Sequence, residues 1–129
     1  MEKYTLNGEQ SACRFIDREA VMINAETSAY YSLNQTGSFI LRELVVSARS
    51  PDEVLGRMKD HFGVASEELE GDVRQTIGRL ESEGLISRSD AGVAGVSIEG
   101  ENEVGLPDIY EKPMLDRHGE LEQLILSGE

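Results

Sequence analysis

Basic residues, cysteine and long apolar runs are all scarce in this sequence. The 129 residues include 12 Lys plus Arg against 25 Asp plus Glu, which gives a net charge of −13 and a pI near 4.5. Nucleic acids and anionic membranes bind to basic surface, so this charge argues against both classes of partner. No apolar run approaches the ~20 residues that cross a bilayer. We therefore expect a soluble protein with no nucleic-acid or membrane partner.

Residues that carry catalysis or bind metals are also few. Cys13 is the single cysteine, so no disulfide can form within the chain, and the first ten residues do not read as a secretory signal; both features favour a cytoplasmic protein. His61 and His118 have no Ser, Cys or carboxylate constellation around them. No Cys or His spacing is typical of a zinc site. We expect no enzyme activity, no metal and no cofactor.

Charge and glycine content divide the chain into three parts. Residues 99–129 contain nine acids and two bases, so the C-terminal end is the most acidic part of the chain. Four glycines and few large apolar side chains lie between residues 89 and 106, which predicts a flexible linker. We expect a folded domain at 1–88, a linker at 89–106 and a separate C-terminal segment at 107–129.

The first third of the chain is rich in strand-forming residues. Tyr4–Leu6 and residues 12–16 flank Asn7-Gly8, the dipeptide best suited to a type I′ turn, and this predicts a hairpin. Residues 20–24 and 28–33 predict two further strands. These segments indicate a small antiparallel sheet.

Three amphipathic helices are predicted after the strands. Asn34 is the expected N-cap of a helix over 35–47. Ser50 precedes a proline and, three residues later, a glutamate, which together predict a capping box for a second helix that ends at Gly63. A third helix is expected over 66–83, stopped by Gly84. Strands followed by three helices indicate an α+β domain of winged-helix type.

Two motifs in this order resemble the PqqD-like family, the precursor-recognition domains of ribosomally made, post-translationally modified peptides (RiPPs). The first is Tyr-Tyr-Ser-Leu-Asn-Gln-Thr-Gly at 30–37, and the second is Leu-Glu-Ser-Glu-Gly-Leu-Ile at 80–86. The resemblance implies a PqqD fold, with a three-stranded antiparallel sheet followed by three helices. It also implies a noncatalytic domain that binds a leader peptide.

The C-terminal segment carries a second resemblance. Residues 110–119 are similar to the Tyr-x-x-Pro-x-Leu-x-x-x-Gly pattern of lasso-peptide leaders. With Leu121, which begins an apolar pattern of helical spacing, the expected leader determinants are Tyr110, Pro113, Leu115, Gly119 and Leu121. The two resemblances together imply a lasso-pathway recognition element joined to its own leader, by a natural or an engineered fusion.

The resemblance also implies partners. The leader would bind in cis or be exchanged with a neighbouring copy. A leader peptidase of the transglutaminase-like cysteine protease type would then remove the leader, and an asparagine-synthetase-like cyclase would act afterwards.

An extended segment can bind by adding a strand to the open edge of a sheet. Residues 108–115 suit this mode, because Pro113 lacks an N–H and is tolerated on the outer edge of an added strand. The resemblance implies that the leader pairs with the third strand and lies against the third helix. The expected peptide-binding residues on the domain are Ala29, Tyr30, Tyr31, Ser32, Leu33, Asp72, Val73, Thr76, Arg79 and Leu80.

Alternative interpretations exist for several of these features. Val73 and Leu80 lie on an apolar helix stripe, which usually packs into a core. Arg79 can pair with a tail acid such as Glu111 or, by i,i+4 spacing, with Glu83. The tail alone would be interpreted as a disordered acidic extension. Two other functions are a peptide chaperone for a radical-SAM or other RiPP enzyme and a winged-helix DNA-binding regulator, although the third helix is too acidic to approach phosphates.

Overall fold

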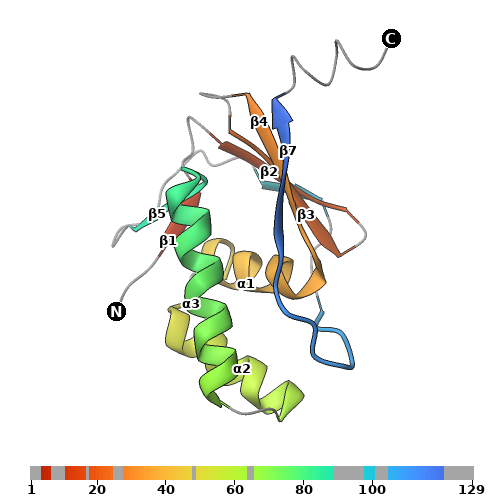
Figure 1. Cartoon of the computed structure of the whole chain (residues 1–129), viewed down its shortest axis with the longest axis vertical. Helices are drawn as coiled ribbons and strands as arrows, with labels where there is room; N and C mark the ends of the chain where they lie inside the picture. The colour runs from red at the N-terminus through yellow and green to blue at the C-terminus, as the bar shows by residue number, and fades with distance from the viewer. Residues whose placement is uncertain are drawn as a thin grey trace.

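The computed structural model describes residues 4–6, 11–16, 18–24, 28–47, 49–63, 66–88, 98–100 and 105–120. The strands are β1 (Tyr4–Leu6), β2 (Ser11–Ile16), β3 (Glu19–Asn24), β4 (Ala29–Leu33), β5 (Ile86–Arg88), β6 (Ile98–Gly100) and β7 (Leu115–Glu120). The helices are α1 (Gln35–Val45), α2 (Pro51–Phe62) and α3 (Ser66–Ser82). Figure 1 shows these elements as an α+β arrangement, which confirms the predicted fold class.

The larger sheet contains the three antiparallel strands that the sequence predicts. Its order is β6-β2-β3-β4-β7, and β2, β3 and β4 are antiparallel neighbours along the chain. Ile16 lies opposite Glu19, so β2 and β3 are joined by a tight turn in which Arg18 has a φ of 68°. Alternate side chains point into the core, among them Phe15, Met22 and Tyr31.

The predicted hairpin between β1 and β2 is wrong. β1 pairs antiparallel with β5 instead, with Leu6 opposite Ile86, and the two strands form a separate sheet. Gly84, at a φ of 74°, ends the turn after α3 and sends the chain back so that Ile86 enters the core. Leu6 and Ile86 are both buried in this pairing. Burial between distant segments therefore outweighed the turn preference of Asn7-Gly8, which itself lies outside the described residues.

The three helices begin and end near the predicted residues. The Asn34 side chain accepts the Gly37 N–H at the start of α1, and Ser50 and Glu53 form both bonds of the capping box at the start of α2. Gly63 ends α2 in the left-handed conformation at a φ of 65°. α1 packs against β3 and β4, and α2 packs against α3, so the core lies between the helices and the sheet.

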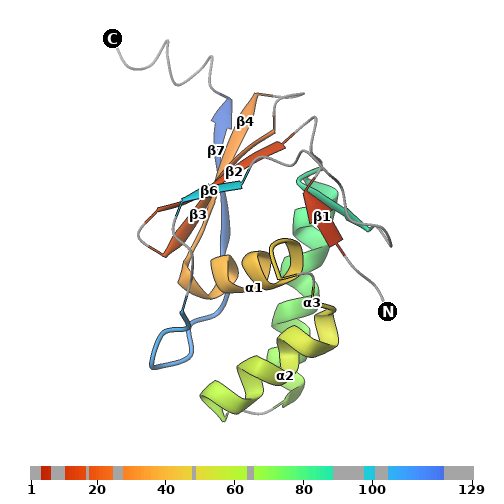
Figure 2. The same cartoon turned by 180° about the vertical axis from the view of Figure 1, so that it is seen from behind.

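Segments from the C-terminal third of the chain occupy both edges of the larger sheet (Figures 1 and 2). β6 pairs parallel with β2, although it lies within the segment expected to be a flexible linker. β7 pairs antiparallel with β4. The added strand was expected at 108–115, but the paired strand begins at Leu115 and residues 105–114 are irregular. Among the described residues, no helix is long and apolar enough to cross a membrane.

Candidate functional site

Residues 105–120, here called the tail, cross the domain from the end of α2 to the free edge of β4 (Figure 1). At its start, Gln35 Nε2 donates to the Gly105 carbonyl at 2.8 Å, and His61 Nε2 lies 2.9 Å from the Pro107 carbonyl oxygen. At its end, β7 pairs with β4, with Leu115 opposite Leu33 and Arg117 opposite Tyr31. The tail therefore contacts α1 and α2 at its start and the edge of β4 at its end.

Tyr110 is the aromatic anchor of the irregular part. Its ring meets Phe62 edge to face, with 5.1 Å between the centroids, and its hydroxyl donates to Asp72 Oδ2 on α3. Lys112 Nζ lies 3.8 Å from the other Asp72 oxygen. Burial, followed by the hydrogen bond and the charge of Asp72, raises the pKa of Tyr110, so the phenol stays a donor to the carboxylate. Asp72 thus holds two tail side chains.

Pro113 and Leu115 are the buried apolar residues of the tail. Leu115 is 5% exposed and belongs to the hydrophobic core, whereas its neighbour Met114 is 55% exposed. Ile109, four residues before Pro113, is 81% exposed. A small cavity of about 190 Å³ lies where residues 112–116 of the tail meet Gln75, Thr76 and Arg79 of α3. Tyr110, Pro113 and Leu115 therefore face the domain, and Leu106 at the start of the tail also packs against the core.

Arg79 contacts the main chain of the tail. Its Nη1 donates to the Leu115 carbonyl at 2.7 Å. A carboxylate partner, either Glu111 or Glu83, was expected from the sequence. Glu83 instead accepts the Tyr31 hydroxyl at 2.8 Å. A guanidinium that binds a carbonyl recognises an extended backbone independently of the side chain at that position.

We expect Arg79→Ala to weaken docking of the tail by about 1.5–3 kcal/mol, the range for a hydrogen bond from a charged donor. Protection of the Asp116 amide from hydrogen exchange in the full chain measures this loss. Arg74→Ala is the matched control, since Arg74 lies on the same helix and pairs with Glu70 at 3.0 Å. Equal protection in the two variants would contradict a role of Arg79 in docking.

β4 contributes mainly its backbone and two polar side chains. Ala29 and Leu33 are buried, as is Tyr31, whereas strand alternation leaves Tyr30 and Ser32 on the other face. His118 of the tail stacks on Tyr30 with 5.1 Å between the ring centroids, and its Nε2 lies 2.6 Å from Ser32 Oγ. The two β4 side chains on that face therefore contact the end of the tail.

The other predicted site residues have different positions. Val73 and Leu80 lie in the hydrophobic core, as the alternative interpretation had it. Thr76 is buried and donates to the Asp72 carbonyl at 2.8 Å, beside the small cavity. Gly119 lies within β7, and Leu121, with the predicted apolar helical pattern after it, lies outside the described residues.

Sequence reasoning missed several residues that touch the tail: Asn34, Gln35, His61 and Phe62. Asn34 had been assigned only as a helix cap. Its motif, Leu-Asn-x-x-Gly, nevertheless held a signal, because a Cβ on Gly37 would stand 2.8 Å from Leu33 Cδ2 and 3.2 Å from Asn34 Oδ1. Gly37 therefore leaves the space that the Asn34 side chain occupies.

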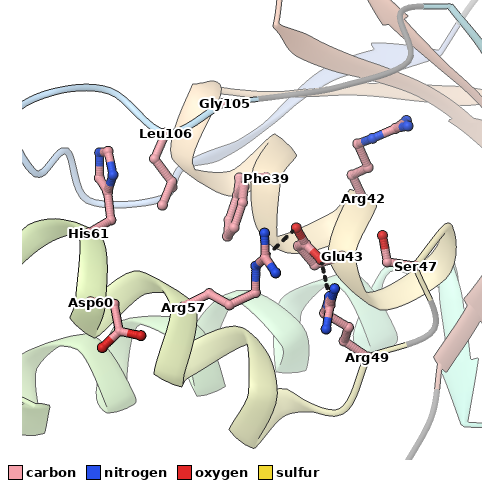
Figure 3. Close-up of a pocket in the computed structure, with 10 residues that line it drawn as sticks. All are labelled: Phe39, Arg42, Glu43, Ser47, Arg49, Arg57, Asp60, His61, Gly105 and Leu106. Atoms are coloured by element: carbon pink, nitrogen blue, oxygen red, sulfur yellow. Dashed lines mark hydrogen bonds and ion pairs between the residues drawn. The ribbon is translucent and has the colours of Figure 1, made fainter.

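A larger cavity, of about 740 Å³, lies between α1 and α2 where Gly105 and Leu106 pass (Figure 3). Glu43 accepts a hydrogen bond from Arg49 Nε at 2.7 Å and lies 3.5 Å from Arg57 Nε. The carboxylate of Glu43 is therefore paired with two arginines that line the same cavity. The described part of the chain has no cluster of three or more His, Cys, Asp or Glu that would hold a metal.

Cys13 does not have the environment of a nucleophile. Its side chain is buried, and burial raises the pKa of the thiol to about 12. The thiol therefore stays protonated at neutral pH and packs as a small apolar group.

Two solved structures share this fold. One, described as TbiB1 in complex with the TbiA(beta) leader peptide, matches with a TM-score of 0.59 and 23% identity over 64% of this chain and 94% of its own. The other, lasso peptide synthetase B1 complexed with the leader peptide, gives a TM-score of 0.60 and 20% identity over 66% of this chain and 98% of its own. Among curated proteins, none matches the sequence.

The sequence itself identifies the family. Residues 19–86, from the start of β3 to the start of β5, match the family described as coenzyme PQQ synthesis protein D (PqqD). The match spans just over half of the 129 residues and includes all three helices and the strand that carries the tail. This chain belongs to the PqqD family.

Proposed function

We propose that this protein is a noncatalytic RiPP recognition element of a lasso-peptide pathway, which binds the leader of a precursor by strand addition. The observation that carries the proposal is the tail, whose Tyr-x-x-Pro-x-Leu-x-x-x-Gly pattern lies along α3 and β4 and becomes an added edge strand from Leu115 onward. The two similar solved structures, each described as a complex with a leader peptide, support the same assignment.

The division of contacts suits a peptide-binding site. The main chain of the tail pairs with β4 and accepts a hydrogen bond from the Arg79 side chain, and these bonds supply affinity for any extended segment. Selectivity comes from the three inward side chains: Tyr110 between Phe62 and Asp72, and Pro113 and Leu115 against α3 and the core. On this proposal residues 1–88 are the recognition domain, 89–106 connect it to the leader, and 107–129 are the leader.

Delivery to partner enzymes is the next step of the proposal. In the cytoplasm, the bound leader would present the attached core to a leader peptidase of the transglutaminase-like type, and a cyclase would follow. A chaperone for a radical-SAM enzyme would use the same surface of α3 and β4, but it would not require the Tyr-x-x-Pro-x-Leu pattern. Selectivity for this pattern therefore separates the two functions.

A titration in trans tests the proposal. The full chain carrying Tyr110→Ala and Leu115→Ala has a weakened tail of its own, and a fluorescent peptide of residues 105–129 is added to it. We expect saturable binding, and a loss of roughly 100-fold or more when the peptide carries the same two substitutions, since both removed side chains are buried anchors. Circular dichroism checks that the acceptor chain is folded. Equal binding of the two peptides, or no binding of either, would overturn the assignment.

A further inference from the structure

Asn34 lies at the point where β4 stops and α1 begins. The Asn34 N–H still acts as part of the strand and donates to the Met114 carbonyl at 3.1 Å. The Asn34 carbonyl no longer does so, because it accepts the Ser38 N–H at 2.8 Å as the first bond of the helix. In a regular antiparallel pair that carbonyl would accept the Met114 N–H. The backbone therefore leaves the tail without its next partner.

The side chain of Asn34 supplies the missing bonds. Its Oδ1 accepts the Met114 N–H at 3.0 Å, and its Nδ2 donates to the Lys112 carbonyl at 2.8 Å. An Asn side chain offers the same donor and acceptor as a peptide group. The same Oδ1 also accepts the Gly37 N–H at 3.0 Å, so one oxygen caps α1 and binds the tail.

We propose that Asn34 acts in place of a strand residue, so that its amide extends β4 by one position and determines at which position of the bound segment a proline is accepted. This inference rests on the proposed function and names the residue that reads the backbone on both sides of Pro113. Among the residues that cap helices well, only asparagine meets both demands: aspartate has no donor, and serine is too short to reach two positions of the tail.

The geometry explains where a proline is accepted. In an extended segment, the N–H and C=O of one residue point to one side, and those of the next residue point to the other. Lys112 and Met114 turn toward Asn34, so the backbone nitrogen of Pro113 faces away from it. Proline at 113 therefore costs no bond to Asn34, whereas proline at 114 removes the N–H that Oδ1 accepts.

The experiment separates this role from helix capping in the full chain. Asn34→Asp and Asn34→Ser keep a good N-cap, because all three residues cap helices about equally well. Ser50→Asn is the matched control, a cap exchange on α2, whose bonds are to Glu53. Hydrogen exchange is followed at the Met114 and Asp116 amides of the tail and at the Ile40 and Leu41 amides of α1.

We expect protection of the two tail amides to fall roughly tenfold in both Asn34 variants, the size of one or two lost hydrogen bonds, with α1 and the control unchanged. Met114→Pro should lower protection at Asp116 more than Met114→Ala does. Unchanged tail protection, or an equal fall in α1 and the tail, overturns the inference. If Arg79→Ala still releases the tail in that case, the proposed function stands, and if no variant does, it fails as well.

Discussion

A leader peptide with alanine in place of Tyr110 is expected to bind the surface formed by α3 and β4 about 2–3 kcal/mol more weakly, roughly 30- to 150-fold in Kd. The tyrosine ring contacts Phe62 edge to face, and its hydroxyl is a donor to Asp72. Alanine loses the apolar contact and also leaves the carboxylate without one of its donors. Titration of the substituted peptide into the full chain with the weakened tail measures the effect.

Two further peptides separate the parts of this contact. Tyr110→Phe keeps the ring and removes only the hydroxyl, so we expect a smaller loss, about 1 kcal/mol. Ile109→Ala is the control, because the Ile109 side chain is 81% exposed beside the anchor. A Tyr110→Ala peptide that binds as tightly as the Ile109→Ala peptide would exclude Tyr110 as an anchor.

Replacing Leu115 with alanine is the second change of large expected effect. Leu115 is the residue at which the tail enters the hydrophobic core, and a truncated core leucine costs about 2–4 kcal/mol. We expect the full chain with Leu115→Ala to lose most of the exchange protection of β7 while β2 and β3 keep theirs. Met114→Ala, one residue earlier and on the exposed side, should leave β7 protected. The same protection in both variants would show that the tail is held by its backbone alone.

The helices could be predicted because their signals are local. Asn34, the Ser50 capping box and Gly63 each act within one helical turn, and the structure places all three where the sequence indicated. The partner of β1 could not be predicted in this way. Asn7-Gly8 favoured a hairpin, but the choice between β2 and β5 depends on how the end of α3 returns to the core. β6 was missed for the same reason, since its three residues form a strand by pairing with β2, a distant segment of the chain.

The tail shows a similar division between local and tertiary information. The pattern of Tyr110, Pro113 and Leu115 singled out the residues that face the domain, although whether they bind a leader stays a prediction. Strict alternation puts Tyr110 on the opposite side from Pro113, and the structure brings them together through an irregular stretch before Leu115. Asn34 was unpredictable as a tail contact because its cap role already accounted for it.

The most direct test of strand addition is the pairing itself, observed by NMR on an isotope-labelled peptide of residues 105–129 bound to the full chain with the weakened tail. The bond from the Asn34 N–H to the Met114 carbonyl makes Leu33 and Leu115 a non-hydrogen-bonded pair, and Tyr31 and Arg117 the next such pair. The α-protons in these pairs lie close together across the strands. We predict cross-strand Overhauser effects between Leu33 and Leu115, and between Tyr31 and Arg117. A bound peptide that gives neither would contradict leader capture by strand addition at β4.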